Sequence, residues 1–329
     1  MKNSTTLLQI FLVATLFIAV TLTVNDMPNE VNWNNGNAEK TSSPDSIWVA
    51  PNLSDLEANT NAKQILYGHN IISQTSKYFG PNGSISNFAN GMNCQNCHLN
   101  AGTKPFGNNY AAVAATYPKF RERSGSIETI AKRINDCFER SLNGKAIDTQ
   151  SNEMLAIIAY INWLGKDVPK NKKPMGSGIL ELAYLNRAAS PQNGEQVYKS
   201  KCITCHQSNG GGQLNIDKIG YAFPPLWGNN SFNMGAGLYR LSRMAGYVKV
   251  NMPLGATYNN PILTDEEAWD VAAFINTQNR PYKNLEKDWP NIAAKPVDHP
   301  FGPFSDNFSE QQHKLGPFEP IKKSRKKSI

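Results

Sequence analysis

The sequence contains only five cysteines, and none of them precedes Cys94. A lipid anchor on an amino-terminal cysteine is therefore excluded. Strict alternation of polar and apolar residues, the pattern typical of half-buried strands, is also scarce, so we expect a mainly helical protein. The 24 glycines and 20 prolines predict loop-rich domains rather than long regular elements.

Little net positive charge lies outside the carboxyl terminus. The formal net charge is +7, but the last nine residues contribute five positive charges and no acid, which leaves about +2 for the rest of the chain. This balance gives no support for nucleic-acid binding by the folded part. We expect the tail to be solvated or disordered. Its basic residues are Lys322, Lys323, Arg325, Lys326 and Lys327.

The amino terminus has the features of an export segment. Lys2 precedes an apolar run from Leu7 to Val24, after which the chain turns polar at Asn25. The run is just long enough to span a bilayer, and no clear small-x-small cleavage pattern follows it. Residues 1–25 are therefore either a cleaved signal peptide or an uncleaved anchor. Both alternatives predict a periplasmic protein, soluble or tethered to the inner membrane.

The rest of the chain contains two segments with the same order of sequence features, which indicates an internal duplication at low similarity. Each version has a Cys-x-x-Cys-His motif, a long irregular middle and a late amphipathic helix. Stretches rich in Asn, Ser, Pro, Gly or Lys separate them. The predicted parts are a linker at 26–50, a first domain at 51–168, a linker at 169–178, a second domain at 179–286, and an extension with the basic tail at 287–329.

The two Cys-x-x-Cys-His motifs predict covalently attached haem c. Two thiols three residues apart on one helical turn reach both vinyl groups of a haem, and the adjacent histidine then lies beneath the iron. A zinc pair or a thioredoxin-like redox pair is the alternative. Neither explains a histidine directly after both copies in an exported chain. The attachment residues are Cys94, Cys97 and His98 in the first domain, and Cys202, Cys205 and His206 in the second.

The second domain offers a methionine as the sixth iron ligand. Met252 stands directly before Pro253 and ahead of the late helix, as in class I cytochromes c. Met234 and Met244 are the alternatives, and either can simply fill the core. Because a thioether ligand raises the haem potential, Met252 favours an electron-transfer role.

The first domain has no methionine in the matching place, where Cys137 stands instead. Four thioether bonds would use the other cysteines, so Cys137 has no partner for an internal disulfide. We interpret it as a ligand of the first haem. The alternative is a buried apolar cysteine, because Ile127, Ile130 and Ile134 form a helical stripe with it.

The neighbours of Cys137 favour an anion site. On a helix, Arg133 and Ser141 lie four residues to either side of it and share its face. Arg123 and Arg140 are also close in the sequence. Nearby cations favour the thiolate form of a cysteine and attract small dianions. The alternative is an ordinary solvated arginine face.

Together these features resemble the dihaem thiosulfate dehydrogenase / tetrathionate reductase family, over most of residues 60–285. The arginine-flanked cysteine is the most specific part of the resemblance. The matching runs are His98-Leu-Asn-Ala-Gly-Thr103, Arg133-Ile-Asn-Asp-Cys137-Phe-Glu-Arg140-Ser141, Pro224-Pro-Leu-Trp-Gly228 and Asn251-Met-Pro-Leu254.

The resemblance implies two tandem class I cytochrome c-like domains with one haem c each. It implies that Cys137 is the axial ligand opposite His98, and that Arg123, Arg133 and Ser141 bind the anion. The second haem, held by His206 and Met252, would pass electrons to a small soluble or membrane-bound cytochrome. Some members place a lysine beside that methionine as a redox-switched ligand. This chain has Asn251 there, which favours plain His/Met ligation.

The implied reaction joins two thiosulfates into tetrathionate and releases two electrons, or runs in reverse. In the implied mechanism the outer sulfur of one thiosulfate bonds to Cys137, and a second thiosulfate attacks that sulfur. Three alternatives stay open: a non-enzymatic dihaem electron-transfer cytochrome, a dihaem peroxidase, and a sulfur-oxidation subunit that loads thiosulfate onto a partner protein.

Overall fold

A computed structural model describes residues 46–56 and 60–326 of the 329-residue chain. The predicted export segment at 1–25 and most of the predicted linker at 26–50 lie outside the described residues, as does Lys327. Within the described ranges, we find no helix with the length and hydropathy of a bilayer-spanning segment.

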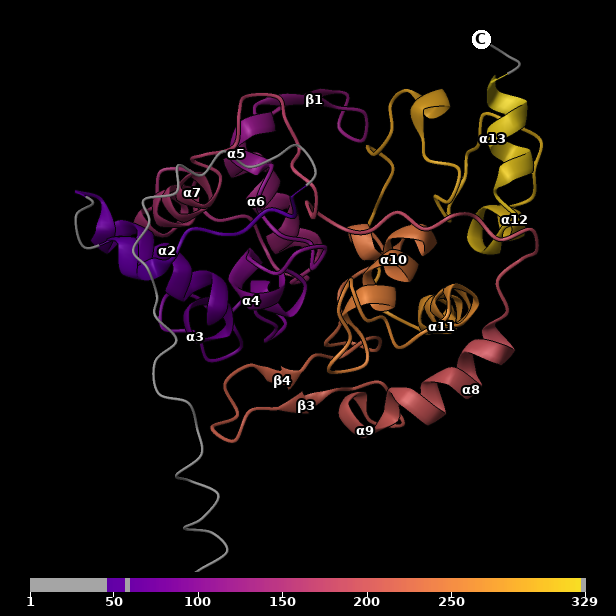
Figure 1. Cartoon of the computed structure of the whole chain (residues 1–329), viewed down its shortest axis with the longest axis horizontal. Helices are drawn as coiled ribbons and strands as arrows, with labels where there is room; N and C mark the ends of the chain where they lie inside the picture. The colour runs from indigo at the N-terminus through magenta and orange to yellow at the C-terminus, as the bar shows by residue number, and fades with distance from the viewer. Residues whose placement is uncertain (1–45, 57–59, 327–329) are drawn as a thin grey trace, which may run out of the picture. The chain divides into compact units, whose positions relative to one another are not determined.

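The first half of the described chain is built mainly from short helices (Figure 1). Its two longest helices, α2 and α7, pack against each other, and one small hairpin pairs β1 with β2. The elements are η1 Leu53–Leu56, α2 Ala62–Ser73, α3 Thr75–Phe79, η2 Cys94–Asn96, α4 Leu99–Gly102, α5 Val113–Thr116, β1 Lys119–Arg121, β2 Ser126–Glu128, α6 Ile130–Arg140 and α7 Asn152–Leu164.

The second half repeats this plan. Here α8 packs against α11, α10 also contacts α11, and a second small hairpin pairs β3 with β4. The mainly helical, loop-rich prediction is therefore confirmed. The elements are α8 Pro191–Lys201, α9 Ile203–His206, β3 Gln213–Leu214, β4 Tyr221–Phe223, η3 Gly237–Tyr239, α10 Leu241–Asn251, α11 Asp265–Thr277, η4 Ile292–Ala294, α12 Glu310–Leu315 and α13 Glu319–Lys326.

Hydroxyl side chains fix where the late helices begin. Ser151 accepts a hydrogen bond from the backbone N–H of Met154 at the start of α7 (3.2 Å). Thr264 and Glu267 form a reciprocal capping box at the start of α11. Because both helices begin at fixed residues, their apolar faces point inward with a defined register.

A glycine lets the early helix of each half cross its late helix closely. A Cβ at Gly68 would lie 2.0 Å from the carbonyl oxygen of Ala156 on α7, and a Cβ at Gly194 would lie 1.9 Å from that of Asp270 on α11. Such distances are far inside van der Waals contact, so only glycine permits these crossings. The same device in both halves agrees with an internal duplication.

The substitution Gly194→Ala is expected to destabilise the second half by about 1–3 kcal/mol, because the added methyl group forces α8 and α11 apart. In an isolated helix the same change would be stabilising, so the sign of the effect reports the crossing. The measurement is thermal unfolding of the haem-loaded protein, followed by circular dichroism. Gly237→Ala is the matched control, because a Cβ there meets nothing within 4 Å. Equal unfolding temperatures for the two variants would contradict the tight crossing.

The carboxy-terminal extension packs on the second half, so the expectation of disorder is wrong for the described part of the tail. The expectation of solvation holds for Lys322, Lys323 and Lys326, which are exposed. Phe318 and Ile321 are buried, and the ring of Phe318 contacts Tyr184 and Trp269. Arg325 forms an ion pair with Asp306 (2.7 Å). A count of positive charges does not reveal these two apolar residues, Phe318 just before α13 and Ile321 on it.

Candidate active site

The first Cys-x-x-Cys-His motif lies in the wall of a mostly apolar cavity of about 910 Å³, part of which is open to solvent. The 3-10 helix η2 and the residues that follow it supply Cys94, Cys97 and His98 to this wall. Helices α6 and α7 line the cavity with further side chains, among them Ile157 and Ile161. The motif thus faces a space bounded by apolar groups, as a haem requires.

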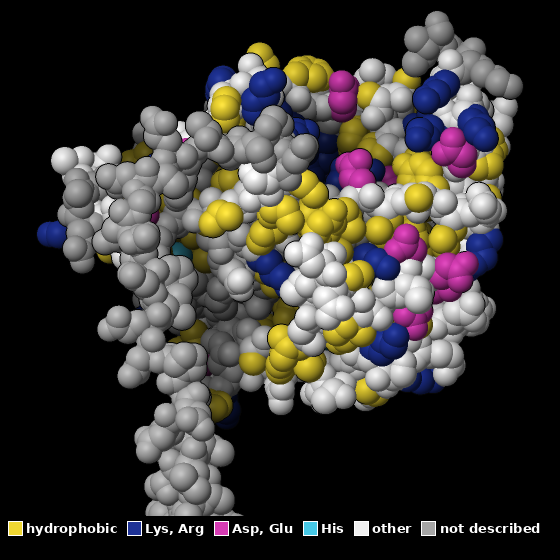
Figure 2. Space-filling view, viewed as in Figure 1, with side chains coloured by type: hydrophobic (Ala, Val, Ile, Leu, Met, Phe, Trp, Pro, Cys, Tyr) yellow, Lys and Arg dark blue, Asp and Glu magenta, His cyan; other side chains and the backbone are white. Residues whose placement is uncertain are grey.

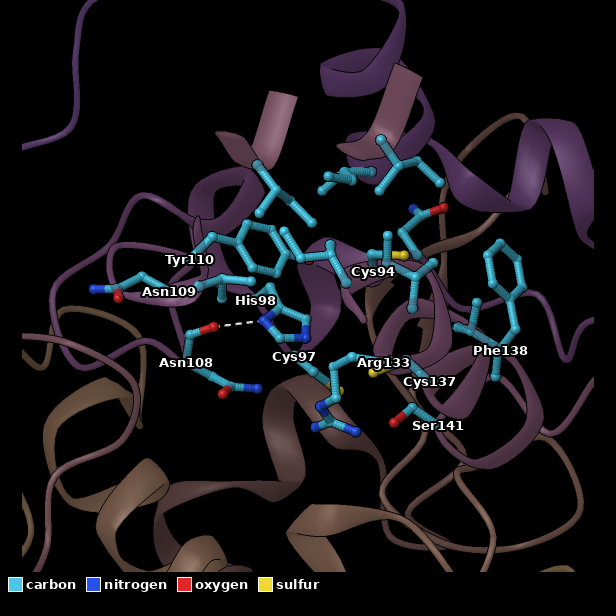
Figure 3. Close-up of a pocket in the computed structure, with 18 of the residues that line it drawn as sticks. Cys94, Cys97, His98, Asn108, Asn109, Tyr110, Arg133, Cys137, Phe138 and Ser141 are labelled. Atoms are coloured by element: carbon cyan, nitrogen blue, oxygen red, sulfur yellow. Dashed lines mark hydrogen bonds between the residues drawn. The ribbon is translucent and has the colours of Figure 1, made fainter. Parts of the chain in front are cut away.

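His98 is held in the tautomer that suits a metal ligand. Its Nδ1 atom lies 2.5 Å from the carbonyl oxygen of Asn108 (Figure 3), and its ring stacks on Tyr110 with centroids 4.5 Å apart. Burial, aided by the charge of Arg133, lowers the pKa of His98 to about 4, so the ring is neutral at pH 7. Since Nδ1–H donates to the carbonyl, the lone pair of Nε2 is left for iron.

Helix α6 brings three of the predicted site residues to the same cavity. Arg133, Cys137 and Ser141 all line it. Figure 3 shows them together on one side of His98, opposite Asn108. Ser141 ends the helix, and its N–H donates to the carbonyl oxygen of Cys137 (2.8 Å). Their spacing of four residues places them on one helical face.

Arg133 is the cation that faces this cavity without an acidic partner. Among residues 46–56 and 60–326, no carboxylate lies within ion-pair distance of its guanidinium. The negative charge of the Cys137 thiolate raises the pKa of Arg133. An unpaired guanidinium beside a sulfur atom is a suitable binding partner for a second anion.

The structure does not bring Arg123 to the cavity lining. Its guanidinium forms an ion pair with Asp136, which also binds Lys132 (2.6 Å). Burial, together with the nearby charges of Arg140 and Arg133, lowers the pKa of Arg123. Arg123 therefore lies close enough to influence the site through its charge, while its hydrogen bonds go to Asp136.

Arg140 is neutralised by Asp288, a residue that no pattern in the sequence singles out. Both of its terminal nitrogens donate to Asp288 (2.7 and 2.8 Å), a residue of the carboxy-terminal extension. The backbone N–H of Trp289, the next residue, donates to the carbonyl oxygen of Arg123 (2.7 Å). Asp136 had a local signal, its i, i+4 spacing from Lys132, but Asp288 is separated from Arg140 by most of the second half.

The second motif lies in a larger cavity of about 2290 Å³, also partly open to solvent. The Nδ1 atom of His206 lies 2.9 Å from the carbonyl oxygen of Pro224, which repeats the arrangement at His98, and burial lowers the pKa of His206. Met252, directly after α10, lines the cavity, as does Met244, whereas Met234 is not part of the lining.

The two cavities share part of their walls. Cys97, Met92 and Asn93 line both of them. The hydroxyl group of Tyr247, on α10, donates to the carbonyl oxygen of Asn96 across the boundary between the halves (3.2 Å). Groups bound in the two cavities would therefore be neighbours.

Both motifs match known families of haem proteins. Residues 85–169 match the family described as SoxA/TsdA, cytochrome c domain, and residues 191–279 match the family described as Cytochrome c. Each match contains one Cys-x-x-Cys-His motif. The chain therefore has two cytochrome c domains and binds haem c.

Several relatives of this chain are named thiosulfate dehydrogenase. The chain is 40% identical over 209 residues to the thiosulfate dehydrogenase of Psychrobacter arcticus, which covers 63% of this chain and 62% of that protein. It is 41% identical over 196 residues to that of Allochromatium vinosum (58% and 71%), and 34% identical over 237 residues to that of Stutzerimonas stutzeri (72% and 74%).

A solved structure shares this fold. The "as isolated" form of thiosulfate dehydrogenase (TsdBA) from Marichromatium purpuratum superposes with a TM-score of 0.67 at 27% identity, over 82% of this chain and 54% of that chain. The chain thus spans less than two thirds of the Psychrobacter relative and of the solved chain. The identity to relatives covered over more than two thirds of their length, together with the shared fold, shows that this chain belongs to the thiosulfate dehydrogenase family.

Proposed function

We propose that the protein binds one haem c in each cavity and interconverts thiosulfate and tetrathionate, 2 S₂O₃²⁻ ⇌ S₄O₆²⁻ + 2 e⁻. One observation carries this proposal. The sulfur of Cys137, the unpaired guanidinium of Arg133 and the hydroxyl of Ser141 line the cavity that contains His98. This combination provides a reactive sulfur and an anion site beside a redox centre.

The residues present fit two haem groups. Thioether bonds to Cys94 and Cys97 would hold the first, and His98, through Nε2, and Cys137 would bind its iron. The second would be held by Cys202 and Cys205, with His206 and Met252 as ligands. When bound, these groups accept or donate electrons one at a time.

The sulfur of Cys137 carries half of the product. As a thiolate it forms a bond to the outer sulfur of thiosulfate, which gives Cys137–S–S–SO₃⁻ and releases two electrons. A second thiosulfate attacks the sulfur that is bonded to Sγ of Cys137, so that the bond to Sγ breaks, tetrathionate forms and Cys137 is again a thiolate. Charge balances in both steps, and the reverse sequence consumes tetrathionate.

Arg133 and Ser141 oppose the repulsion between the reacting anions. Two dianions about 6 Å apart repel each other by roughly 10 kcal/mol at an effective dielectric constant near 20. A guanidinium fixed in an apolar wall offsets part of this without reorganising during the reaction. We assign Arg123 a supporting role through its charge, because its hydrogen bonds are committed to Asp136.

Electrons leave through the second cavity. Cys97 lines both cavities, so the route between them is short. The side-chain amide of Asn251 donates to the carbonyl oxygens of Phe106 and Tyr247, which agrees with plain His/Met ligation. The second cavity is partly open to solvent, where a small cytochrome can accept the electrons. The export segment at 1–25 supports a periplasmic location for this exchange.

The direct test is an assay of the haem-loaded protein with sodium thiosulfate and ferricyanide, with tetrathionate measured as the product. Tetrathionate formation at half the rate of ferricyanide reduction supports the enzyme. Haem reduction without tetrathionate would instead indicate the electron-transfer cytochrome. Turnover with hydrogen peroxide and none with thiosulfate would indicate the peroxidase.

A further inference from the structure

A group of basic side chains gathers at β1, next to the first cavity. We call Lys119, Arg121 and Lys173 the outer cation cluster. The Nζ atom of Lys119 lies 4.7 Å from the centroid of the Tyr117 ring, and Tyr117 lines the cavity. Figure 2 shows Lys and Arg side chains gathered over this region, at the top of the view and beside a hollow. The ammonium group of Lys119 is therefore separated from the cavity by one aromatic ring.

Acidic side chains do not balance this cluster. Glu128 on β2 is 1% exposed and lies 3.8 Å from Arg121, and its carboxylate oxygens make no hydrogen bond within the described chain. One carboxylate is thus shared among several cations. Neither Lys119 nor Lys173 has a carboxylate within ion-pair distance in residues 46–56 and 60–326.

The charges of the cluster and of the cavity act on each other. Burial, followed by the charges of Arg121, Lys173 and Arg133, lowers the pKa of Lys119 to about 8. Because Arg133 lines the cavity, these positive charges extend from β1 to the cavity wall. A cation whose neighbours are mostly cations gains stability when an anion binds between them.

The proposed reaction needs more positive charge than the cavity offers. Two dianions must meet, and tetrathionate carries a sulfonate group at each end. In the cavity, Arg133 is free to bind one of them, whereas Arg123 and Arg140 are paired with Asp136 and Asp288. The other sulfonate group therefore needs a cationic binding place near the cavity.

We propose that the outer cation cluster is a second dianion site, which holds the sulfonate end of the second thiosulfate while the first is bound at Cys137 and Arg133. In reverse it holds the distal sulfonate of tetrathionate. This inference rests on the proposed function, since it assumes that Cys137 is where the sulfur chemistry occurs. Lys119 and Arg121 are binding residues in this assignment and make no bond to the reacting sulfur atoms.

The test is steady-state formation of tetrathionate from sodium thiosulfate with ferricyanide as electron acceptor, because product forms only after the second thiosulfate has bound. We expect Lys119→Gln and Arg121→Gln to raise the half-saturating thiosulfate concentration about three- to tenfold, and to lower the limiting rate by less than that. Inhibition by sodium sulfate, relative to sodium chloride at equal ionic strength, should also weaken. Lys63→Gln is the matched control: it removes the same charge from exposed Lys63 on α2, which lines neither cavity.

Each outcome decides between the two proposals. If the variants match Lys63→Gln in half-saturating concentration and in sulfate inhibition while the natural protein forms tetrathionate, the second site is refuted and the proposed function stands. If the natural protein forms no tetrathionate at all, both fail. A lower limiting rate with an unchanged half-saturating concentration would also overturn the inference, because it would place these residues in the reaction step itself.

Discussion

Cys137→Ala is expected to lower the rate of tetrathionate formation by at least about 10³-fold, because it removes the sulfur that carries the first thiosulfate. Cys137→Ser should lose as much, since an oxygen of similar size cannot form the sulfur–sulfur bond. The measurement is ferricyanide-linked turnover of protein with full haem content. Low-temperature electron paramagnetic resonance should show the loss of a thiolate-bound low-spin haem.

The haem of the second cavity is an internal control for correct folding of these variants. The second cavity does not include Cys137, so the spectrum and potential of the haem bound there should be unchanged. Near-normal turnover in a variant with both haem groups would show that Cys137 only tunes the iron. It would leave the electron-transfer cytochrome as the better interpretation.

Arg133→Gln is expected to lower kcat/KM for thiosulfate by about 10²- to 10³-fold, the usual cost of removing one preorganised donor from a developing charge. Gln keeps a polar group in the cavity wall but cannot offset the repulsion between two dianions. Arg133→Lys should recover part of the loss, because a lysine keeps the charge without the bidentate geometry of a guanidinium. The measurement is steady-state kinetics with varied thiosulfate.

Lys132→Gln is the matched control for Arg133. It removes the same charge from the neighbouring residue of α6, but Lys132 is 51% exposed and directed to Asp136. We expect its kcat/KM to stay within about threefold of the natural protein, as is usual for exposed ion pairs. Similar losses in both variants would mean that the net charge of α6 matters, and that no specific anion contact exists at Arg133.

The sequence predicted the local parts of the site well. The Cys-x-x-Cys-His spacing located both cavities, because covalent attachment demands that spacing. The i, i+4 spacing located one face of α6, and Arg133, Cys137 and Ser141 do line one cavity. One detail of the predicted stripe was wrong: Ile127 lies on β2 and is 72% exposed, because the cap at Thr129 begins the helix only at Ile130.

Contacts between distant segments could not be predicted. Whether an arginine is free or paired depends on which carboxylate the fold brings to it, and the partner of Arg140 is 148 residues away. The basic tail shows the same limit, because its fold depends on two apolar anchors, Phe318 and Ile321, among many charges. Net charge and composition are sums along the chain and carry no information about such pairings. The boundaries of the two predicted domains likewise remain predictions.

The pairing of Arg140 with Asp288 ties the two halves of the molecule together functionally. Asn233, from the second half, adds to this junction by donating to the carbonyl oxygen of Glu139 and to the side chain of Asn143 (both 2.9 Å). A first domain separated from the rest of the chain would lose the carboxylate partner of Arg140 and carry one more uncompensated guanidinium near the proposed anion site. A thiosulfate affinity measured on it would then describe an altered electrostatic environment, so the first half is not an independent module that can be transplanted unchanged.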